Sequence, residues 1–138
     1  MSTAETKVWG SVQHVFDGPI AVSLLSLDHA GVCCSIHKHD KRDNLFHVLS
    51  GTIFVHVFFV DKELKIRHDY THCLGSSDIW TAEFGVVHCF EVLEPGKVVE
   101  VYKTIDRSPA DIEDIQRYRV GGLAEKVLAE TNCPKRNW

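Results

Sequence analysis

Two histidines stand one residue apart in the stretch GVCCSIHKHDKRDNLFHVLSG, which runs from Gly31 to Gly51. On a β-strand alternate side chains share a face, so His37 and His39 would point into one cavity. Neutral imidazoles are common ligands for zinc, iron, nickel and copper, and two on one rigid strand leave positions open for a third ligand and a substrate. His88 follows a glycine by three residues, where a tight turn delivers it to the start of a strand. The pattern predicts a three-histidine metal site.

The composition limits the class of protein that carries this site. The chain has 138 residues, of which 44% are hydrophobic and 25% charged, which predicts one soluble domain. The formal net charge of −4 supplies no basic surface for a phosphate backbone, so we expect no nucleic-acid partner. The N-terminal residues do not resemble a signal peptide, and no apolar run has the length of a membrane span. We therefore expect a cytoplasmic protein with a small-molecule ligand, and free thiols at its five cysteines.

The elements that position the histidines read as short strands. From Val8 to Lys103 apolar or alternating runs, rich in β-branched and aromatic residues, are separated by turn residues, which predicts an all-β barrel over about residues 8–104. The segment that follows has a different pattern. SPADIEDIQRY begins with Ser108 as a candidate N-cap and Pro109 at the first helical position, and LAEKVLAE predicts a second short helix. We expect a C-terminal helical segment over about residues 108–131 and a mobile, non-functional NCPKRNW tail.

The histidine stretch resembles the first motif of the cupin superfamily, which reads G, five residues, HxH, three or four residues, E, six residues, G. Gly31, His37, His39, Asn44 and Gly51 match every spacing, and only the glutamate is replaced, by Asn44. The resemblance implies a small jelly-roll barrel in which three histidines and an acidic residue hold a divalent transition metal such as zinc, iron, manganese or nickel. An amide oxygen brings no negative charge, so Asn44 would hold a divalent ion less tightly than glutamate.

The second cupin motif, G-x5-P-x-G-x2-H-x3-N, is matched more loosely. Gly85 and His88 align, whereas Ser77, Glu83 and Val92 replace the first glycine, the proline and the asparagine. The resemblance implies that His88 completes the ligand set. The fourth position is left to Asn44, to a water or to Asp43; alternatively the pocket holds no metal and Asn44 hydrogen-bonds a ligand directly.

Two short sequence motifs, one at each end of the predicted barrel, show a further resemblance. KVWG, from Lys7 to Gly10, and EDIQRY, from Glu113 to Tyr118, resemble the opening and the close of the cupin domain in type II mannose-6-phosphate isomerases and mannose-1-phosphate guanylyltransferases. The resemblance implies an isomerase of sugars or sugar phosphates, in which a metal polarises a carbonyl while a base moves a proton between neighbouring carbons. The alternatives are an iron-dependent dioxygenase-like cupin and a non-catalytic module that binds a small ligand.

Residue type alone suggests the general base. Glu83 lies near the turn before His88, and His56 is the other candidate. The remaining histidines, His68 among them, lack a comparable spacing and are interpreted as surface or core residues. The charged run that contains Arg42 is interpreted as a solvated turn, with a phosphate or carboxylate site at the barrel mouth as the alternative.

The alternation of side chains also predicts what surrounds the ligands. Cys33, Ser35, Phe46 and Phe90 share the parity of the ligand face and are expected to line the pocket. The run TIFVHVFFV, residues 52–60, is too apolar for a strand with one face in water. Burial between two subunits would explain this run, so we expect a homodimer. A strand buried on both faces within one chain is the alternative.

Overall fold

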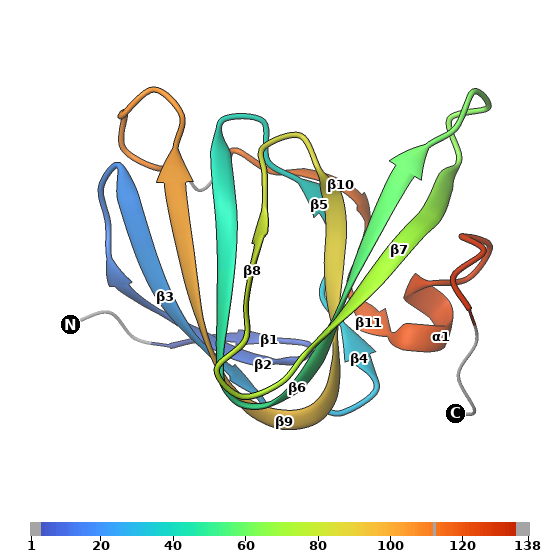
Figure 1. Cartoon of the computed structure of the whole chain (residues 1–138), viewed down its shortest axis with the longest axis horizontal. Helices are drawn as coiled ribbons and strands as arrows, with labels where there is room; N and C mark the ends of the chain where they lie inside the picture. The colour runs from blue at the N-terminus through green and yellow to red at the C-terminus, as the bar shows by residue number, and fades with distance from the viewer. Residues whose placement is uncertain (1–3, 112, 135–138) are drawn as a thin grey trace.

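The computed structural model describes residues 4–111 and 113–134, and its strands form one curled eleven-stranded sheet (Figure 1). The strands are β1 (Glu5–Lys7), β2 (Gly10–Phe16), β3 (Ile20–Leu27), β4 (Val32–Cys33), β5 (Ile36–Lys38), β6 (Arg42–Val60), β7 (Ile66–Leu74), β8 (Ile79–Ala82), β9 (Val87–Thr104), β10 (Gln116–Arg119) and β11 (Gly122–Leu123). A single short helix, α1 (Ala124–Val127), follows them in the described part of the chain. The prediction of an all-β barrel is confirmed.

Two long strands, β6 and β9, organise the barrel. They pair antiparallel from Arg42 opposite Thr104 to Phe58 opposite Val87, and both curve through the bottom of the molecule in Figure 1. The register shifts near the middle of the pair, where a bulge lets both strands bend. One half of β6 then pairs with β8 and the other half with β7, while β3 pairs with β9. Because the two strands bend, each contributes to both walls of the barrel.

The bend requires a glycine at position 51. Gly51 has a φ of 79°, in the left-handed region that favours glycine. A Cβ atom there would lie 2.6 Å from the carbonyl oxygens of Glu94 and Pro95. The strands thus approach too closely for any side chain, which explains why the first motif ends in glycine.

Side chains alternate between the barrel interior and the outside as the strand period requires. In β3 every second residue from Ala21 to Leu27 is buried, and the residues between them are partly exposed. The first half of β6 shows the same pattern, with Asn44, Phe46 and Val48 all at most 1% exposed. The interior of the barrel therefore carries both the apolar core and the polar groups of the candidate site.

The prediction that SPADIEDIQRY forms a helix is wrong. The Ser108 hydroxyl donates to Asp106 instead of capping a helix, and the Ser108 carbonyl accepts from the Thr104 hydroxyl at 2.7 Å, which holds a tight turn directly after β9. Residues 116–119 then form β10, which pairs with the edge of β5. A strand edge offers unpaired backbone groups, and this pairing outweighs the local helix signals. Within the segment predicted to be helical, α1 is the helix among the described residues. Ile112 lies outside the described residues.

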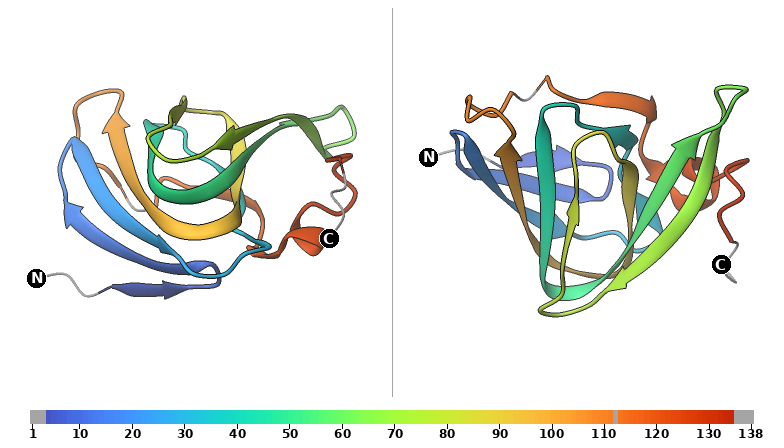
Figure 2. Two further views of the ribbon diagram at one scale, coloured as in Figure 1. Left: turned by 60° about the horizontal axis from the view of Figure 1, so that its bottom comes forward. Right: turned by 45° about the horizontal axis from the view of Figure 1, so that its top comes forward.

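The C-terminal segment crosses the open end of the barrel and then descends beside β7 (Figure 2). There the His68 backbone N–H of β7 donates to the Thr131 carbonyl at 2.6 Å, and Cys133 Sγ lies 3.7 Å from Nδ1 of His56 in the TIFVHVFFV run. Four consecutive residues of β6, from Val55 to Phe58, are at most 4% exposed in the single chain. Burial on both faces within one chain therefore accounts for these four residues, whereas Phe59 and Val60 at the end of the run are 49% and 38% exposed, and the homodimer stays a prediction. Of the expected tail, Asn132, Cys133 and Pro134 are described and residues 135–138 lie outside the described residues.

All five cysteines are free thiols, as expected. Among the described residues, no helix has both the length and the apolar character needed to cross a membrane.

Candidate metal centre and cavity

The three histidines singled out by their spacing meet inside the barrel. His37 on β5 is the direct register partner of His88 on β9, and His39 follows β5 by one residue. One ring nitrogen of each lies within 4.8 Å of one ring nitrogen of each of the others. Their exposed fractions are 8%, 3% and 1% for His37, His39 and His88. Strand pairing thus gathers three buried imidazoles at one point, although the third is about fifty positions away in the chain.

Hydrogen bonds orient all three rings in the same way. Each Nδ1 lies at hydrogen-bond distance from a backbone carbonyl oxygen: that of Ser35 for His37 at 2.8 Å, of Asp114 for His39 at 2.7 Å, and of Val86 for His88 at 2.9 Å. A carbonyl only accepts, so Nδ1 carries the proton and the lone pair is on Nε2. At His39 the Arg42 guanidinium nitrogens also lie 3.3 and 3.4 Å from Nδ1, and the shorter contact to the Asp114 carbonyl decides the assignment. The Nε2 atoms of His39 and His88 are buried and have no hydrogen-bond partner among the described residues. Metal-binding histidines characteristically show this arrangement, so the donor set fits a metal ion.

Burial keeps these imidazoles neutral. It lowers the pKa of His39 and of His88 to about 4. The pKa of His37 is also lowered well below its ordinary value, mainly by burial and further by the neighbouring His88 and His39. At neutral pH all three side chains are therefore uncharged and available as metal ligands.

The C-terminal segment takes part in building the site, which the sequence did not predict. The carboxylate of Asp114 accepts the backbone N–H groups of Asp40 and Lys41, each at 3.0 Å, while its carbonyl holds the His39 ring. On the other side, the Gly85 N–H donates to the His39 carbonyl at 2.6 Å. Gly85 has a φ of 81°, which a side chain would disfavour. Two separate turns therefore fix the position of His39.

Asn44 occupies the acidic corner of the motif and is bonded to a carboxyl group from the next strand. Its Nδ2 donates to Glu100 Oε2 at 3.2 Å, and its Oδ1 is buried without a partner among the described residues. Burial raises the pKa of Glu100, an effect that hydrogen bonds from Tyr102 and Asn44 partly offset. A carboxyl group is therefore present beside Asn44, on β9 instead of β6. Asp43, the other residue considered for this corner, instead accepts the Phe84 N–H at 2.9 Å.

Sequence reasoning missed Glu100. The available signal was weak: Glu100 is the one acidic side chain within the apolar run VVEVY, on the face that Tyr102 shares by strand parity. The two proposed bases lie elsewhere. Glu83 is exposed in the turn before β9, and His56 belongs to a different cluster, described below. Neither of them lines the cavity.

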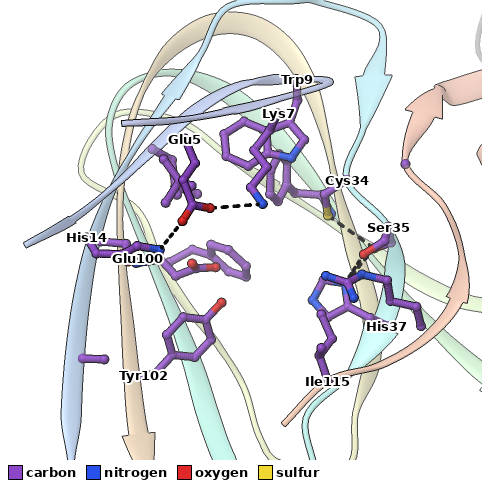
Figure 3. Close-up of a pocket in the computed structure, with 18 of the residues that line it drawn as sticks. Glu5, Lys7, Trp9, His14, Cys34, Ser35, His37, Glu100, Tyr102 and Ile115 are labelled. Atoms are coloured by element: carbon purple, nitrogen blue, oxygen red, sulfur yellow. Dashed lines mark hydrogen bonds and ion pairs between the residues drawn. The ribbon is translucent and has the colours of Figure 1, made fainter. Parts of the chain in front are cut away.

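A cavity of about 760 Å³ opens beside the histidines (Figure 3). Glu100 and Tyr102 lie across it from His37, as the figure shows. The lining includes Ser35, Phe46 and Phe90, all three as predicted.

Cys33, the fourth residue expected to line the pocket, is absent from the lining of this cavity. Cys33 is fully buried away from the cavity, and Cys34 lines it instead. The physical reason is local: β4 ends at Cys33 and β5 begins at Ile36, and the interval between them breaks the alternation of side chains.

Arg42 lies inside the cavity rather than on a solvated turn. It is 7% exposed, and its guanidinium carbon lies 3.9 Å from the centre of the Tyr102 ring. Arg117 on β10 also lines the cavity, at its exposed rim. Neither arginine forms a salt bridge with any carboxylate in the described part of the chain. Two cationic groups are thus available to a ligand in the cavity.

Comparison with solved structures identifies the architecture. Oxalate decarboxylase from Bacillus subtilis matches with a TM-score of 0.66 over 85% of this chain, at 17% identity. An RmlC-like cupin from Shewanella frigidimarina matches with a TM-score of 0.58 over 81% of this chain and 87% of its own, at 15% identity. This chain has the cupin jelly-roll fold. CapF is a further cupin-fold neighbour, with a TM-score of 0.63 over 87% of this chain at 17% identity.

This chain matches only part of the length of two of these proteins. It spans 30% of the length of the oxalate decarboxylase and 34% of the length of CapF. No protein-family model matches the sequence, and no curated protein matches it.

Proposed function

We propose that this chain is a small metal-binding cupin that acts on a sugar or sugar phosphate by moving a proton between neighbouring carbons, as isomerases do. One observation carries the proposal: a buried carboxyl group, Glu100, lines the same cavity as His37, and His37 belongs to a cluster of three neutral histidines. A Lewis acid and a base positioned at one cavity are the two elements that such a proton transfer needs.

The histidines would hold a divalent transition metal through their Nε2 atoms. The unpartnered Oδ1 of Asn44 is a candidate for a further contact, either to the metal or to a ligand. When bound, the metal would polarise a substrate carbonyl and thereby acidify the adjacent C–H group. Because His37, His39 and His88 are all neutral, they leave the full positive charge of the ion available for this effect.

Glu100 supplies the base in this proposal. Burial raises its pKa towards the range in which a carboxyl group can both take and return a proton near neutral pH. Asn44 holds one of its oxygens, and Tyr102 also hydrogen-bonds to it, so the group has a fixed position. That position lies across the cavity from His37 (Figure 3).

The rest of the lining fits a ligand with both polar and apolar parts. Arg42 and Arg117 are suited to a phosphate or a carboxylate, because a guanidinium group can donate two parallel hydrogen bonds to either anion. Trp9, Phe46 and Phe90 offer apolar surface, and the rings of Trp9 and Phe90 pack edge to face with their centres 5.2 Å apart. A phosphorylated sugar combines the anionic group and the ring faces that such a lining recognises.

Metal content tests the first half of the proposal. Untagged wild-type protein is compared by elemental mass spectrometry with the His37→Ala/His88→Ala double variant and with His29→Ala, an exposed control. We expect the double variant to contain one equivalent of transition metal less than the wild type, and the control to match the wild type. Equal metal content in all three proteins would contradict the ligand set.

Isotope exchange tests the second half. Aldose and ketose phosphates are incubated with the protein in D₂O, and exchange of the C–H next to the carbonyl is followed by NMR. We expect exchange with the wild type and at least about 100-fold slower exchange with Glu100→Gln, which keeps the metal but removes the base. Equal exchange rates in the two proteins would refute the role of Glu100. Ligand binding that survives full removal of metal would instead favour a non-catalytic binding module.

A second function is favoured by one feature of the same site. Three neutral histidines without a carboxylate ligand also suit an iron centre for oxygen chemistry. Iron in the purified protein, together with substrate-dependent oxygen consumption, would select this alternative over the isomerase.

A further inference from the structure

A second cluster of metal-binding side chains lies on the face of the paired strands β6 and β9 that is opposite the three-histidine site. It consists of His56 on β6, His68 on β7 and Cys133 after α1, and one ligand atom of each lies within 4.8 Å of those of the other two. His56 pairs in register with Cys89, the neighbour of His88. Since successive side chains of a strand point to opposite faces, this cluster is separate from the three-histidine site.

A buried carboxylate fixes one of the imidazoles. Glu91 is fully buried, and its Oε1 lies 2.9 Å from His56 Nε2. A carboxylate accepts, so Nε2 carries the proton and Nδ1 of His56 has the lone pair. That Nδ1 is the atom that faces the other members, lying 3.7 Å from Cys133 Sγ. Carboxylate, histidine and metal in this order are a recurring arrangement at zinc sites, where the carboxylate fixes the tautomer and makes the ligand more basic.

A hydroxyl group lies between the two imidazoles. Thr71 Oγ1 is 2.7 Å from His56 Nδ1 and 2.7 Å from His68 Nε2. These nitrogens therefore converge on one small volume, and Cys133 borders it from the C-terminal segment. Without a metal the hydroxyl bridges the two rings, which makes a purely structural hydrogen-bond network the rival explanation.

The donor set selects the kind of metal. Two imidazole nitrogens and one thiolate are typical ligands of Zn²⁺, with a fourth position for water or another oxygen. In the metal-free protein, burial raises the pKa of the Cys133 thiol to about 11. Zinc binding would have to displace that proton, as it does wherever a cysteine becomes a ligand.

We propose that His56, His68 and Cys133 form a second metal site that binds zinc and fastens the segment after α1 to strands β6 and β7. The same segment already contacts β7 through the backbone hydrogen bond from His68 to Thr131 and through the Arg67 guanidinium, which donates to the Glu130 carbonyl at 3.1 Å. In Figure 1 α1 and the segment after it lie at the right of the molecule, on the side where β7 begins. The zinc ion would thus join three elements that are distant in the sequence, and this inference does not depend on the proposed isomerase activity.

Cobalt(II) absorption distinguishes the two sites. A cobalt ion bound by a thiolate gives a sulfur-to-metal charge-transfer band in the near ultraviolet, and a site of three histidines gives none. We expect the band on adding cobalt to metal-free wild-type protein. It should be lost in Cys133→Ser and kept both in His37→Ala/His88→Ala and in Cys73→Ser, which removes an exposed cysteine of β7. No band in the wild type, or a band that persists in Cys133→Ser, would overturn the proposal.

Zinc stoichiometry and stability provide a second readout. The wild type should bind one more equivalent of zinc than Cys133→Ser or His68→Ala, and zinc should raise the melting temperature of the wild type more than that of either variant. The two substitutions remove different ligands, and neither His68 nor Cys133 is fully buried, so both proteins are expected to fold. Equal zinc content in the wild type and both variants would show that the cluster is only a hydrogen-bond network. If His37→Ala/His88→Ala were the one variant to lose zinc, the protein would have only the three-histidine site and the proposal would be wrong.

Discussion

The burial of His88 predicts a specific dependence of stability on pH in the metal-free protein. His88 is 1% exposed, and burial lowers its pKa from 6.5 to about 4. In the unfolded chain the same side chain takes up a proton near pH 6.5. Between these two values the unfolded state binds more protons than the folded state. The free energy of unfolding therefore falls as the pH falls from 6.5 towards 4, and it is fully regained above 6.5.

The size of the effect follows from the shift. A shift of one pKa unit corresponds to about 1.4 kcal/mol, so this residue contributes about 3 kcal/mol over the whole window and about 2 kcal/mol by pH 5. Other groups titrate in the same range, and Glu100, whose pKa burial raises, acts in the opposite direction. The difference between wild type and His88→Gln reports the contribution of His88 together with its coupling to His37 and His39, whose pKa values it lowers, because glutamine does not titrate.

Urea denaturation followed by circular dichroism, after treatment with a chelator, measures this difference. We expect the free energy of unfolding to fall between about pH 7 and pH 5 by about 2 kcal/mol more in the wild type than in His88→Gln. His29→Gln changes an exposed histidine and should keep the wild-type slope. The reasoning would be refuted if His88→Gln followed the wild-type curve, since His88 would then titrate alike in both states.

Three further predictions follow from single contacts. Asn44→Leu removes one of the two side-chain donors to the buried Glu100 carboxyl group and should lower the free energy of unfolding by about 1–3 kcal/mol in urea; an unchanged value would show that water replaces the donor. Gly51→Ala should cost at least about 2 kcal/mol in the same assay, whereas Gly122→Ala, with no atom near its Cβ, should cost less than about 0.5 kcal/mol. Glu91→Gln should weaken zinc binding at the His56 site about 10- to 100-fold by competition with a chelating dye, and unchanged affinity would remove Glu91 from that site.

Local patterns predicted the parts of this protein that local geometry controls. The alternation of side chains placed His37 on the interior face and also put Phe46 and Phe90 there. The first motif ends in the glycine at position 51, where the structure shows a close backbone approach that allows no side chain. These features depend on the two-residue period of a strand and on the freedom of glycine, which can be read from a few neighbouring residues.

Two expectations fail, one because a distant segment pairs with the chain and one because a strand ends early. SPADIEDIQRY has a helix signature, yet the edge of β5 pairs with residues 116–119 and makes them a strand. Cys33 was placed by extending the alternation through an interval that is not a strand. In the first case tertiary contacts outweighed a local preference that amounts to a few tenths of a kcal/mol per residue, about the scale of helix propensities, whereas at Cys33 the strand itself ends.

The sequence by itself determined the barrel class and the three histidines at the candidate metal site, because strand periodicity and motif spacing are properties of the chain. Only the tertiary structure decided which groups join them. Glu100 reaches Asn44 across 56 positions, and Cys133 reaches His56 across 77, through the register of β6 with β9 and the path of the C-terminal segment. Register is set by the packing of the whole sheet and by its bulges, so no short stretch of sequence specifies it.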